Sequence, residues 1–235
     1  MPNDPDDLHA IASLDEPARR ALYEWVASSG RAVGRDEAAA AAGVSRALAA
    51  FHLDRLVKDG LLIPEYRRLS GRTGPGAGRP AKLYRRAPRE VSVTLPERRY
   101  ETAARLFAET LERLGTRPDD GAPDELKEAA RELGKEAGTG AASAAGRPRS
   151  RTGRRGAVVA ALSERGYEPF EVDDGEIRLR NCPYHALVNE HRPLVCGMNL
   201  ALVEGVVSGA GEAGLTARLD SRPGLCCVTI DEAAG

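Results

Sequence analysis

The sequence contains few cysteine, methionine and aromatic residues, and it has no long apolar run. Its 235 residues include four Cys, two Met, one Trp and three Phe. No apolar run approaches the roughly 18 residues that indicate a membrane-spanning helix. The first ten residues, MPNDPDDLHA, are acidic and polar, whereas a signal peptide is basic and then apolar. We therefore expect a cytoplasmic protein that does not associate with a membrane.

The four cysteines are confined to residues 182–227. Thiols stay reduced in the cytoplasm, so this clustering favours metal or redox chemistry over structural disulfides. Two of the four histidines lie in the same region, within RNCPYHALVNEHRPLVC at residues 180–196. Such a density of soft ligands in one short stretch makes it the first candidate for a metal centre.

The net charge of −1 averages regions of opposite sign. Residues 67–89 contain eight basic side chains and no acidic one, whereas residues 157–235 contain six basic and twelve acidic side chains. A basic surface attracts polyanions and an acidic one repels them. The first region is therefore a candidate for contact with nucleic acid, and the second is not.

Residues 1–90 show the pattern of a winged helix-turn-helix domain. A helical apolar stripe ends at Gly30, and two short helices follow, broken at Gly43 and stopped at Gly60. The second of these begins after Ser45, a good N-cap, and its apolar face carries Ala49, Leu53, Leu56 and Val57. The following stretch, LLIPEYRRLSGRTGPGAGRPAKLYRRA, predicts two strands around a Gly/Pro-rich loop, as in a wing.

The opposite face of that helix and the basic hairpin are the candidate DNA contacts. An amphipathic helix packed in a small helical domain is the alternative, but basic residues on a hairpin after the helix favour DNA. We expect base-edge contacts from the N-terminal end and exposed face of the helix, at Ser45, Arg46, Ala47, Ala50 and Phe51. We expect backbone and minor-groove contacts from Arg72, Arg79, Lys82 and Arg85. Phe51 is alternatively a core residue, and we interpret His52 as a half-buried packing residue.

Residues 91–155 are predicted to contain dimerisation helices and a flexible linker. The segment 96–115 has an apolar stripe at Tyr100, Ala103, Ala104, Phe107 and Leu111. We expect this stripe to form half of a two-fold dimer interface, since helix-turn-helix proteins read paired half-sites as dimers. Packing of the stripe within its own chain is the alternative. A helix over 123–137 precedes GTGAASAAGRPRSRTGRRG at 138–156, whose small residues and arginines predict a flexible linker.

Residues 156–235 are predicted to form an α+β sensor domain, so the fold class of the chain is α+β. The pattern gives a helix over 157–165, a hairpin turning at 173–175, two helices, and a second hairpin over 215–230.

The cysteines are expected at the ends of these elements. Cys182 precedes Pro183, which places it at a helix N-cap, and Cys196 falls in the first turn after Pro193. A helix N-terminus lowers the pKa of a thiol and favours the thiolate. Because side chains alternate along a strand, only one of Cys226 and Cys227 is expected to face the others. The expected ligand set is Cys182, Cys196 and one of the pair Cys226 and Cys227.

Several motifs together resemble the ArsR-like transcriptional regulators related to the Suf-type repressors of iron-sulfur cluster assembly. They are GVSRALAAFHLDRLVKDGLL, GRPAKLYRR, GYEP, NCPYHALVNEH, LVCGMNLALVEG and GLCCV, and they span most of residues 15–230. The resemblance implies a homodimer with a winged helix-turn-helix domain and an iron-sulfur cluster that controls DNA binding. By motif, it assigns the cluster to Cys182, Cys196 and Cys226. The Suf-type repressors often have a further cysteine just before the one that corresponds to Cys182, and this sequence has none there, which leaves the regulated operon and the fourth ligand open. His185 and His191 are candidates for the fourth ligand, and Cys227 is less favoured.

Other interpretations of the cysteine region remain open. Mixed sulfur and nitrogen ligands also suit zinc, the chief alternative to a cluster. The cysteines are alternatively structural, in a domain that binds a small organic effector. A catalytic dyad of Cys182 and His185 has no oriented third member or oxyanion site nearby. We therefore expect a DNA-binding transcriptional regulator and not an enzyme.

Overall fold

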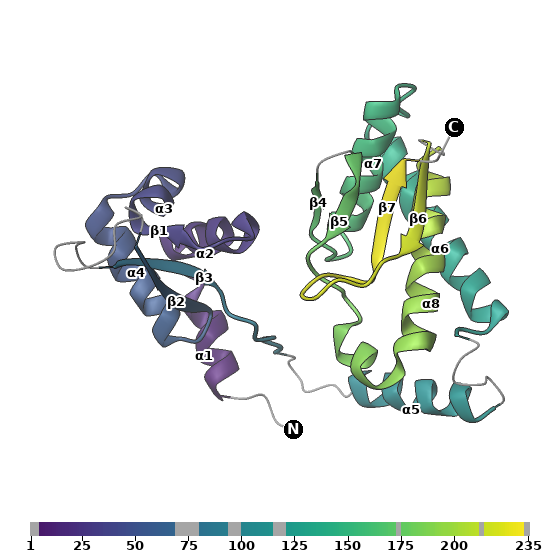
Figure 1. Cartoon of the computed structure of the whole chain (residues 1–235), viewed down its shortest axis with the longest axis horizontal. Coiled ribbons are helices and arrows are strands. Elements are labelled where there is room, and N and C mark those ends of the chain that lie inside the picture. The colour runs from purple at the N-terminus through teal and green to yellow at the C-terminus, as the bar shows by residue number, and fades with distance from the viewer. Residues whose placement is uncertain are drawn as a thin grey trace. The chain divides into compact units, whose positions relative to one another are not determined.

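The computed structural model describes residues 5–68, 80–93, 100–114, 121–172, 175–211 and 214–232. The chain divides into two units, Met1–Arg98 and Arg99–Gly235, and each combines helices with an antiparallel sheet (Figure 1). This confirms the α+β class. Within the described ranges, no helix is long and apolar enough to cross a membrane.

The first unit consists of short helices and a three-stranded sheet with strand order β1-β3-β2. Strands β2 and β3 form an antiparallel hairpin in which Leu62 pairs with Arg86 and Arg67 pairs with Ala81. In chain order the elements are α1 (Pro5–Ser13), α2 (Pro17–Ser29), β1 (Val33–Gly34), α3 (Arg35–Ala42), α4 (Arg46–Lys58), β2 (Leu62–Arg67) and β3 (Ala81–Arg86).

Local sequence signals determine where α3 and α4 end and begin. Gly43 adopts a left-handed conformation at φ 66°, which ends α3 without the steric penalty of a Cβ. The Ser45 hydroxyl then accepts a hydrogen bond from the Leu48 amide at 3.2 Å and caps α4. The predicted apolar face of α4 is buried, with Ala49 and Leu53 at 0% exposure. The two helices and the tight turn at Gly43 therefore form as the sequence predicts.

His52 also lies on the buried side of α4. Only 5% of its surface is exposed, so it is more deeply buried than predicted. Its Nδ1 accepts a hydrogen bond from Arg19 Nε at 3.2 Å, and its Nε2 lies 3.3 Å from a Glu16 carboxylate oxygen. These polar partners compensate for the burial of the ring.

The second unit packs helices against one face of a four-stranded sheet with strand order β4-β5-β7-β6. Ile177 and Leu179 of β5 are buried in the core between sheet and helices, whereas Arg178 between them projects from the other face. The elements are α5 (Tyr100–Arg113), α6 (Asp124–Ala144), α7 (Arg151–Ser163), β4 (Pro169–Glu171), β5 (Ile177–Leu179), α8 (His185–Gly209), β6 (Leu215–Leu219) and β7 (Val228–Glu232).

Helices α6 and α8 lie side by side in unusually close contact (Figure 1). Gly134 and Gly138 of α6 face the backbone of α8, and Gly205 and Gly209 of α8 face the backbone of α6. A Cβ atom at any of these four positions would overlap the backbone of the opposite helix. The glycines therefore bring the two helices close enough for their backbones to touch.

The expected flexible linker at 138–156 is wrong. Helix α6 continues to Ala144, and α7 begins at Arg151, where the Ser150 hydroxyl accepts a hydrogen bond from the Gly153 amide. Gly138 and Ala141 are buried against the rest of the unit. The small residues that suggested flexibility are needed for close helix packing instead.

The apolar stripe predicted on the 96–115 segment divides between two environments. Ala108 and the half-buried Leu111 pack against Leu194 of α8. Tyr100 and Phe107, which belong to the predicted stripe, are 73% and 69% exposed. The helix therefore packs partly within its own chain, as the alternative prediction held, and leaves an apolar face uncovered in the monomer.

The two helices predicted after Cys182 are the two halves of α8. His191 has a non-helical conformation, with φ −127° and ψ 40°, directly before the segment that contains Pro193. Proline cannot donate the amide hydrogen bond that a continuous helix needs. The break at His191 sets the direction of the longer half, which carries Cys196.

Candidate functional sites

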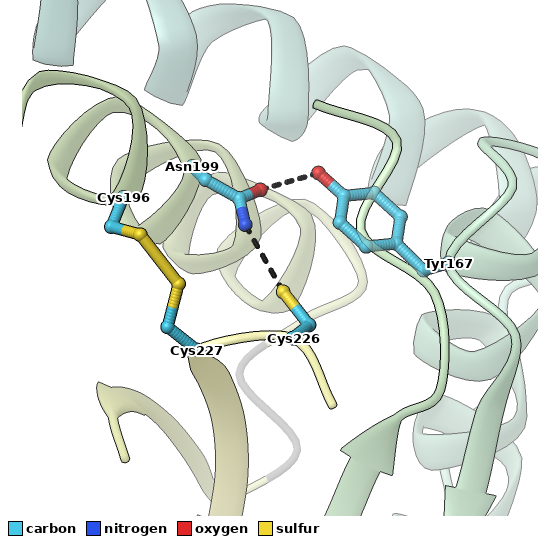
Figure 2. The surroundings of a disulfide bond; sticks show 5 residues. All are labelled: Tyr167, Cys196, Asn199, Cys226 and Cys227. Atoms are coloured by element: carbon cyan, nitrogen blue, oxygen red, sulfur yellow. Dashed lines mark hydrogen bonds between the residues drawn. A yellow bond between two sulfur atoms is a disulfide. The ribbon is translucent and has the colours of Figure 1, made fainter. Parts of the chain in front are cut away.

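All four cysteines lie at one end of the core of the second unit, in two pairs. Cys196 on α8 and Cys227 form a disulfide (Figure 2). Cys182 and Cys226 are free thiols, and their side chains share a hydrogen bond. The pairs adjoin, because Cys226 and Cys227 are consecutive and Cys182 packs on the apolar cluster that contains Cys196 and Cys227.

Backbone contacts fix the position of Cys226 and Cys227. The Cys226 amide donates to the carbonyl of Leu179 at 2.9 Å, and the Cys227 carbonyl accepts from the Asp220 amide at 2.8 Å. Both residues precede β7, which begins at Val228. The expectation that only one of them faces the other cysteines is wrong, because strict alternation applies only within the strand.

Cys182 is not the N-cap of α8. Tyr184 occupies that position, the helix begins at His185, and the Cys182 carbonyl accepts the His185 amide at 3.0 Å. The hydrogen bond to Cys226 and the burial of the thiol raise the pKa of Cys182. The predicted lowering of its pKa is therefore wrong, since the thiol lies before the first helical turn and keeps its proton to donate a hydrogen bond to Cys226.

Of the two free thiols, Cys226 ionises more readily than Cys182. The hydrogen bond from Cys182 lowers the pKa of Cys226 to about 7 against the opposing effect of burial. The backbone amides of Val228 and Cys227 and the side chain of Asn199 also donate to this sulfur and lower its pKa. Hydrogen-bond donors around a sulfur stabilise its negative charge.

Asn199 is a site residue that sequence reasoning missed. It is fully buried on α8, and its Nδ2 donates to Cys226 Sγ at 3.4 Å (Figure 2). Its Oδ1 accepts the hydroxyl of the buried Tyr167 at 2.6 Å. An amide within the otherwise apolar run LVCGMNLALV, three residues after Cys196, was the available signal.

The three expected ligands are not brought to a single point. Cys182 meets Cys226, while Cys196 is bonded to Cys227. In the described part of the chain, no group of three or more His, Cys, Asp and Glu side chains is arranged to hold a metal ion. Of the proposed fourth ligands, His185 is exposed at the start of α8, and His191 is buried with its Nδ1 at 2.9 Å from Glu112.

The second candidate site is the exposed face of α4 in the first unit. Arg46, Ala47 and Phe51 are exposed on this face, and Ala50 is half-buried between them. Phe51 is 64% exposed, so its alternative interpretation as a core residue is wrong. The helix can therefore present a positive end and an apolar side chain to a partner.

The basic hairpin beside α4 is only partly described. Arg85 on β3 is exposed, whereas Arg72 and Arg79 lie outside the described residues. Lys82 Nζ lies 2.5 Å from Asp54 Oδ1 of α4, and the Tyr84 hydroxyl donates to the same oxygen at 2.8 Å. Burial opposes the ionisation of Asp54, but these two hydrogen bonds outweigh it and lower its pKa.

A surface hollow of about 490 Å³ lies beside this contact. Arg35, Arg46, Lys82 and Tyr66 line it, together with Asp36, which forms a solvent-exposed ion pair with Arg46. Exposed ion pairs contribute little to stability, so Arg46 can exchange Asp36 for another anion at small cost. Positive side chains from α3, α4 and β3 thus converge on one surface.

Comparisons of the chain with protein-family models, curated proteins and solved structures find no match.

Proposed function

We propose that the protein is a DNA-binding transcriptional regulator whose DNA binding is controlled by an iron-sulfur cluster held by cysteines of its second unit. In this proposal the first unit is a winged helix-turn-helix domain, α4 is the recognition helix, and the β2–β3 hairpin is the wing. The exposed face of α4 beside a basic hairpin is the observation that carries the proposal. Recognition helices enter the major groove by such a face.

The arrangement of charge in the first unit supports this function. Arg35, Arg46 and Lys82 line the hollow between the starts of α3 and α4 and strand β3. Phosphate contacts from arginine and lysine position a protein on the duplex, and base-edge contacts specify the sequence. Phe51 on the same face suits an apolar contact with a thymine methyl group.

The DNA proposal is tested with the full-length protein and duplex DNA at several salt concentrations. Arg85→Ala should weaken binding to all sequences and reduce the salt slope by about one. Arg46→Ala should change the sequences recovered from a random duplex pool. Arg20→Ala, an exposed arginine of α2, is the control and should do neither. A salt slope for Arg85→Ala equal to that of the wild type and of the Arg20→Ala control would contradict the assignment of the wing.

A homodimer is part of the proposal. Tyr100, Phe107 and Leu114 are exposed and recur at every seventh residue along and just after α5. This is the spacing by which a helix buries an apolar seam against a second helix. Phe107→Asp should split the dimer in light scattering, because a buried charge would lack a partner. Leu133→Asp on α6 is the control, and a Phe107→Asp protein that stays dimeric would place the interface elsewhere.

The cysteine site gathers four sulfur atoms of the kind that bind iron-sulfur clusters, but as they stand they form two pairs and not one ligand group. Cys182 and Cys226 are already side by side, and reduction of the disulfide frees Cys196 beside them. The amides that point at Cys226 are the kind of donors that stabilise cluster sulfurs. When bound, the cluster supplies a one-electron redox centre that links segments far apart in the chain.

Visible absorbance of anaerobically purified protein tests the cluster. A cluster gives a brown protein, whereas zinc or an organic effector leaves it colourless. Cys182→Ser, Cys196→Ser and Cys226→Ser should each abolish the colour and change operator affinity alike. Equal anaerobic affinity in the wild type and all three variants would contradict control by the cluster while leaving DNA binding intact.

The disulfide favours a second candidate function, a metal-free thiol switch in which Cys196 and Cys227 open and close. Here Cys196→Ser and Cys227→Ser change DNA affinity to the same extent in colourless protein, and Cys182→Ser has no effect. The two candidates are therefore separated by colour and by the behaviour of Cys182.

A further inference from the structure

The four cysteines of the second unit differ in exposure. Cys196, Cys226 and Cys227 are buried, at 5%, 3% and 7% exposure, whereas Cys182 is half-buried. Thiol–disulfide exchange requires the attacking thiolate to contact one of the two bonded sulfurs. A thiol in solution therefore reaches Cys182 more easily than it reaches the buried Cys196–Cys227 disulfide.

The Cys226 thiol lies beside this disulfide. Cys196 and Asn199 are three residues apart on α8, so their side chains are neighbours on one face of the helix. Cys226 Sγ lies 3.4 Å from Asn199 Nδ2, and Cys227 is bonded to Cys196, so both consecutive cysteines meet this face (Figure 2). The fold thus places a free thiol next to a disulfide.

Hydrogen bonds give the two free thiols different roles. Cys182 and Asn199 both donate to the Cys226 sulfur. The Tyr167 hydroxyl donates to Asn199 Oδ1 at 2.6 Å, which turns the amide nitrogen toward that sulfur. Donors of this kind stabilise a thiolate, the form of cysteine that attacks a disulfide. Cys226 is therefore the nucleophile of the pair, and Cys182 holds the proton.

From this arrangement we propose that the four cysteines form a thiol–disulfide relay, in which Cys182 is the contact for small external thiols and Cys226 transfers the disulfide from the buried pair to the accessible one. The inference rests on the thiol-switch candidate function, for which it supplies the route of reduction. It requires neither a metal nor DNA.

The first exchange opens the buried disulfide. The Cys226 thiolate bonds to Cys196 Sγ, and Cys227 leaves with the electron pair of the broken bond. Cys182 packs on the cluster that contains Cys227 and gives it a proton. Attack on Cys227 is disfavoured, since consecutive Cα atoms are about 3.8 Å apart and a disulfide usually spans about 4.4 Å or more.

The second exchange moves the disulfide to the accessible pair. The Cys182 thiolate bonds to Cys226, and Cys196 leaves as a thiolate. The two exchanges together conserve one disulfide, one thiol proton and one negative charge, so they need no external oxidant or reductant.

External reduction then takes place at Cys182. A small thiolate attacks the Cys182 sulfur, forms a mixed disulfide and releases Cys226. A second small thiolate attacks the sulfur of the first and releases Cys182. Two small thiols are thereby oxidised to their disulfide, and their two protons pass to the protein thiols.

The rate at which reduced glutathione opens the Cys196–Cys227 bond tests the relay in the full-length, aerobically purified protein. Samples are quenched with iodoacetamide at intervals, and the alkylated cysteines are identified by mass spectrometry. Cys182→Ser and Cys226→Ser should each slow the reaction about tenfold or more, because only direct attack on a buried disulfide remains. Both variants should still reach the fully reduced state.

Met198→Leu is the matched control. Met198 lies on α8, is half-buried against the same cluster as Cys182, and carries no thiol. This variant should be reduced at the wild-type rate. A substitution that only loosened the packing would expose the disulfide and speed its reduction, so the direction of the change separates the relay from a structural effect. Equal or faster reduction in both serine variants would overturn the relay.

The wild-type protein allows a second test without substitution. Iodoacetamide added to the native oxidised protein should modify Cys182 first, and the modified protein should then be reduced as slowly as Cys182→Ser. Reduction at the unmodified rate would overturn the relay, and so would a wild type that holds four free thiols after aerobic purification. Equal DNA affinity of the oxidised and reduced protein would instead refute the thiol switch and leave the relay intact.

Discussion

The two units differ in how their candidate sites are built. In the first unit, the exposed face comes from consecutive turns of one helix, and Arg46, Ala47 and Phe51 are close in sequence. In the second unit, Tyr167, Asn199 and Cys226 come from three segments and meet only through the fold. Helical periodicity is enough to find the first kind of site, whereas the second kind depends on tertiary contacts.

The units also differ in packing. The first has a core of leucine, valine, alanine and tyrosine side chains. In the second, glycines let α6 and α8 approach until their backbones touch. A core built from large side chains can adjust to a small change, but backbone in contact with backbone cannot. Trp25 in the first unit is the single tryptophan, so its fluorescence reports that unit separately.

The largest expected effect is that of Gly138→Ala. The added methyl group would overlap the α8 backbone, so α6 and α8 must separate. We expect the second unit to lose about 3 kcal/mol or more of its free energy of unfolding. Gly140→Ala, two residues along the same helix, meets no atom within 4 Å and should stabilise the unit by ~0.5–1 kcal/mol. Calorimetry distinguishes the two, and equal effects would contradict the close packing.

The next effect concerns the disulfide, which has no counterpart in the cysteine-free first unit. Reduction of the Cys196–Cys227 bond, which closes a sequence separation of 31 residues, should lower the stability of the second unit by about 3 kcal/mol. The unfolding transition seen by Trp25 should not change. Cys227→Ser should make the melting temperature insensitive to dithiothreitol, whereas Cys182→Ser should leave that sensitivity intact.

Asp59 should determine how the free energy of unfolding of the first unit changes with pH. Burial opposes the ionisation of this carboxyl group, but hydrogen bonds from Ser13 and Arg55 outweigh it and lower its pKa. A lowered pKa in the folded state adds stability at neutral pH, which is lost as the pH falls through that folded value. Asp59→Asn should therefore cost about 1–3 kcal/mol at neutral pH and much less in acid.

Urea unfolding followed by Trp25 fluorescence at neutral and acidic pH measures this effect. Asp36→Asn is the control, because Asp36 is largely exposed and its ion pair with Arg46 is also exposed. It should change stability by less than ~0.5 kcal/mol at either pH. A cost for Asp59→Asn that stays constant across the pH range would show that its charge makes no contribution.

The smallest effect is expected from Asp54→Asn on the α4 face. Loss of this carboxylate frees Lys82 from its ion pair and removes a negative charge from the surface that we propose binds DNA. Non-specific duplex affinity should rise, and the salt slope should steepen by about 0.9 per additional phosphate contact. Glu24→Gln, an exposed charge change on α2, should not alter the slope. A slope that stays the same in Asp54→Asn would mean that Lys82 does not reach the DNA.

Much of the local structure followed from sequence pattern. Gly43, Ser45 and the apolar positions of α4 predicted a helix, a turn and a second helix where the structure has them. Both hairpins of the second unit were also predicted, since alternating strands and turn residues are local signals. Where prediction failed, one local pattern was compatible with two tertiary environments. The small residues after Gly138 are typical of flexible linkers and also of close helix pairs.

The sequence by itself therefore determined the α+β class, the order of most helices and strands, and the face of α4 that solvent can reach. Only the tertiary structure decided that Cys196 bonds to Cys227, that Cys182 donates a hydrogen bond to Cys226, and that Asn199 points at a sulfur. Local elements depend on neighbouring residues along the chain, which a pattern records. Contacts between distant segments depend on how the helices and the sheet pack, and in this protein that packing depends on glycines whose role appears only when the opposite helix is in place.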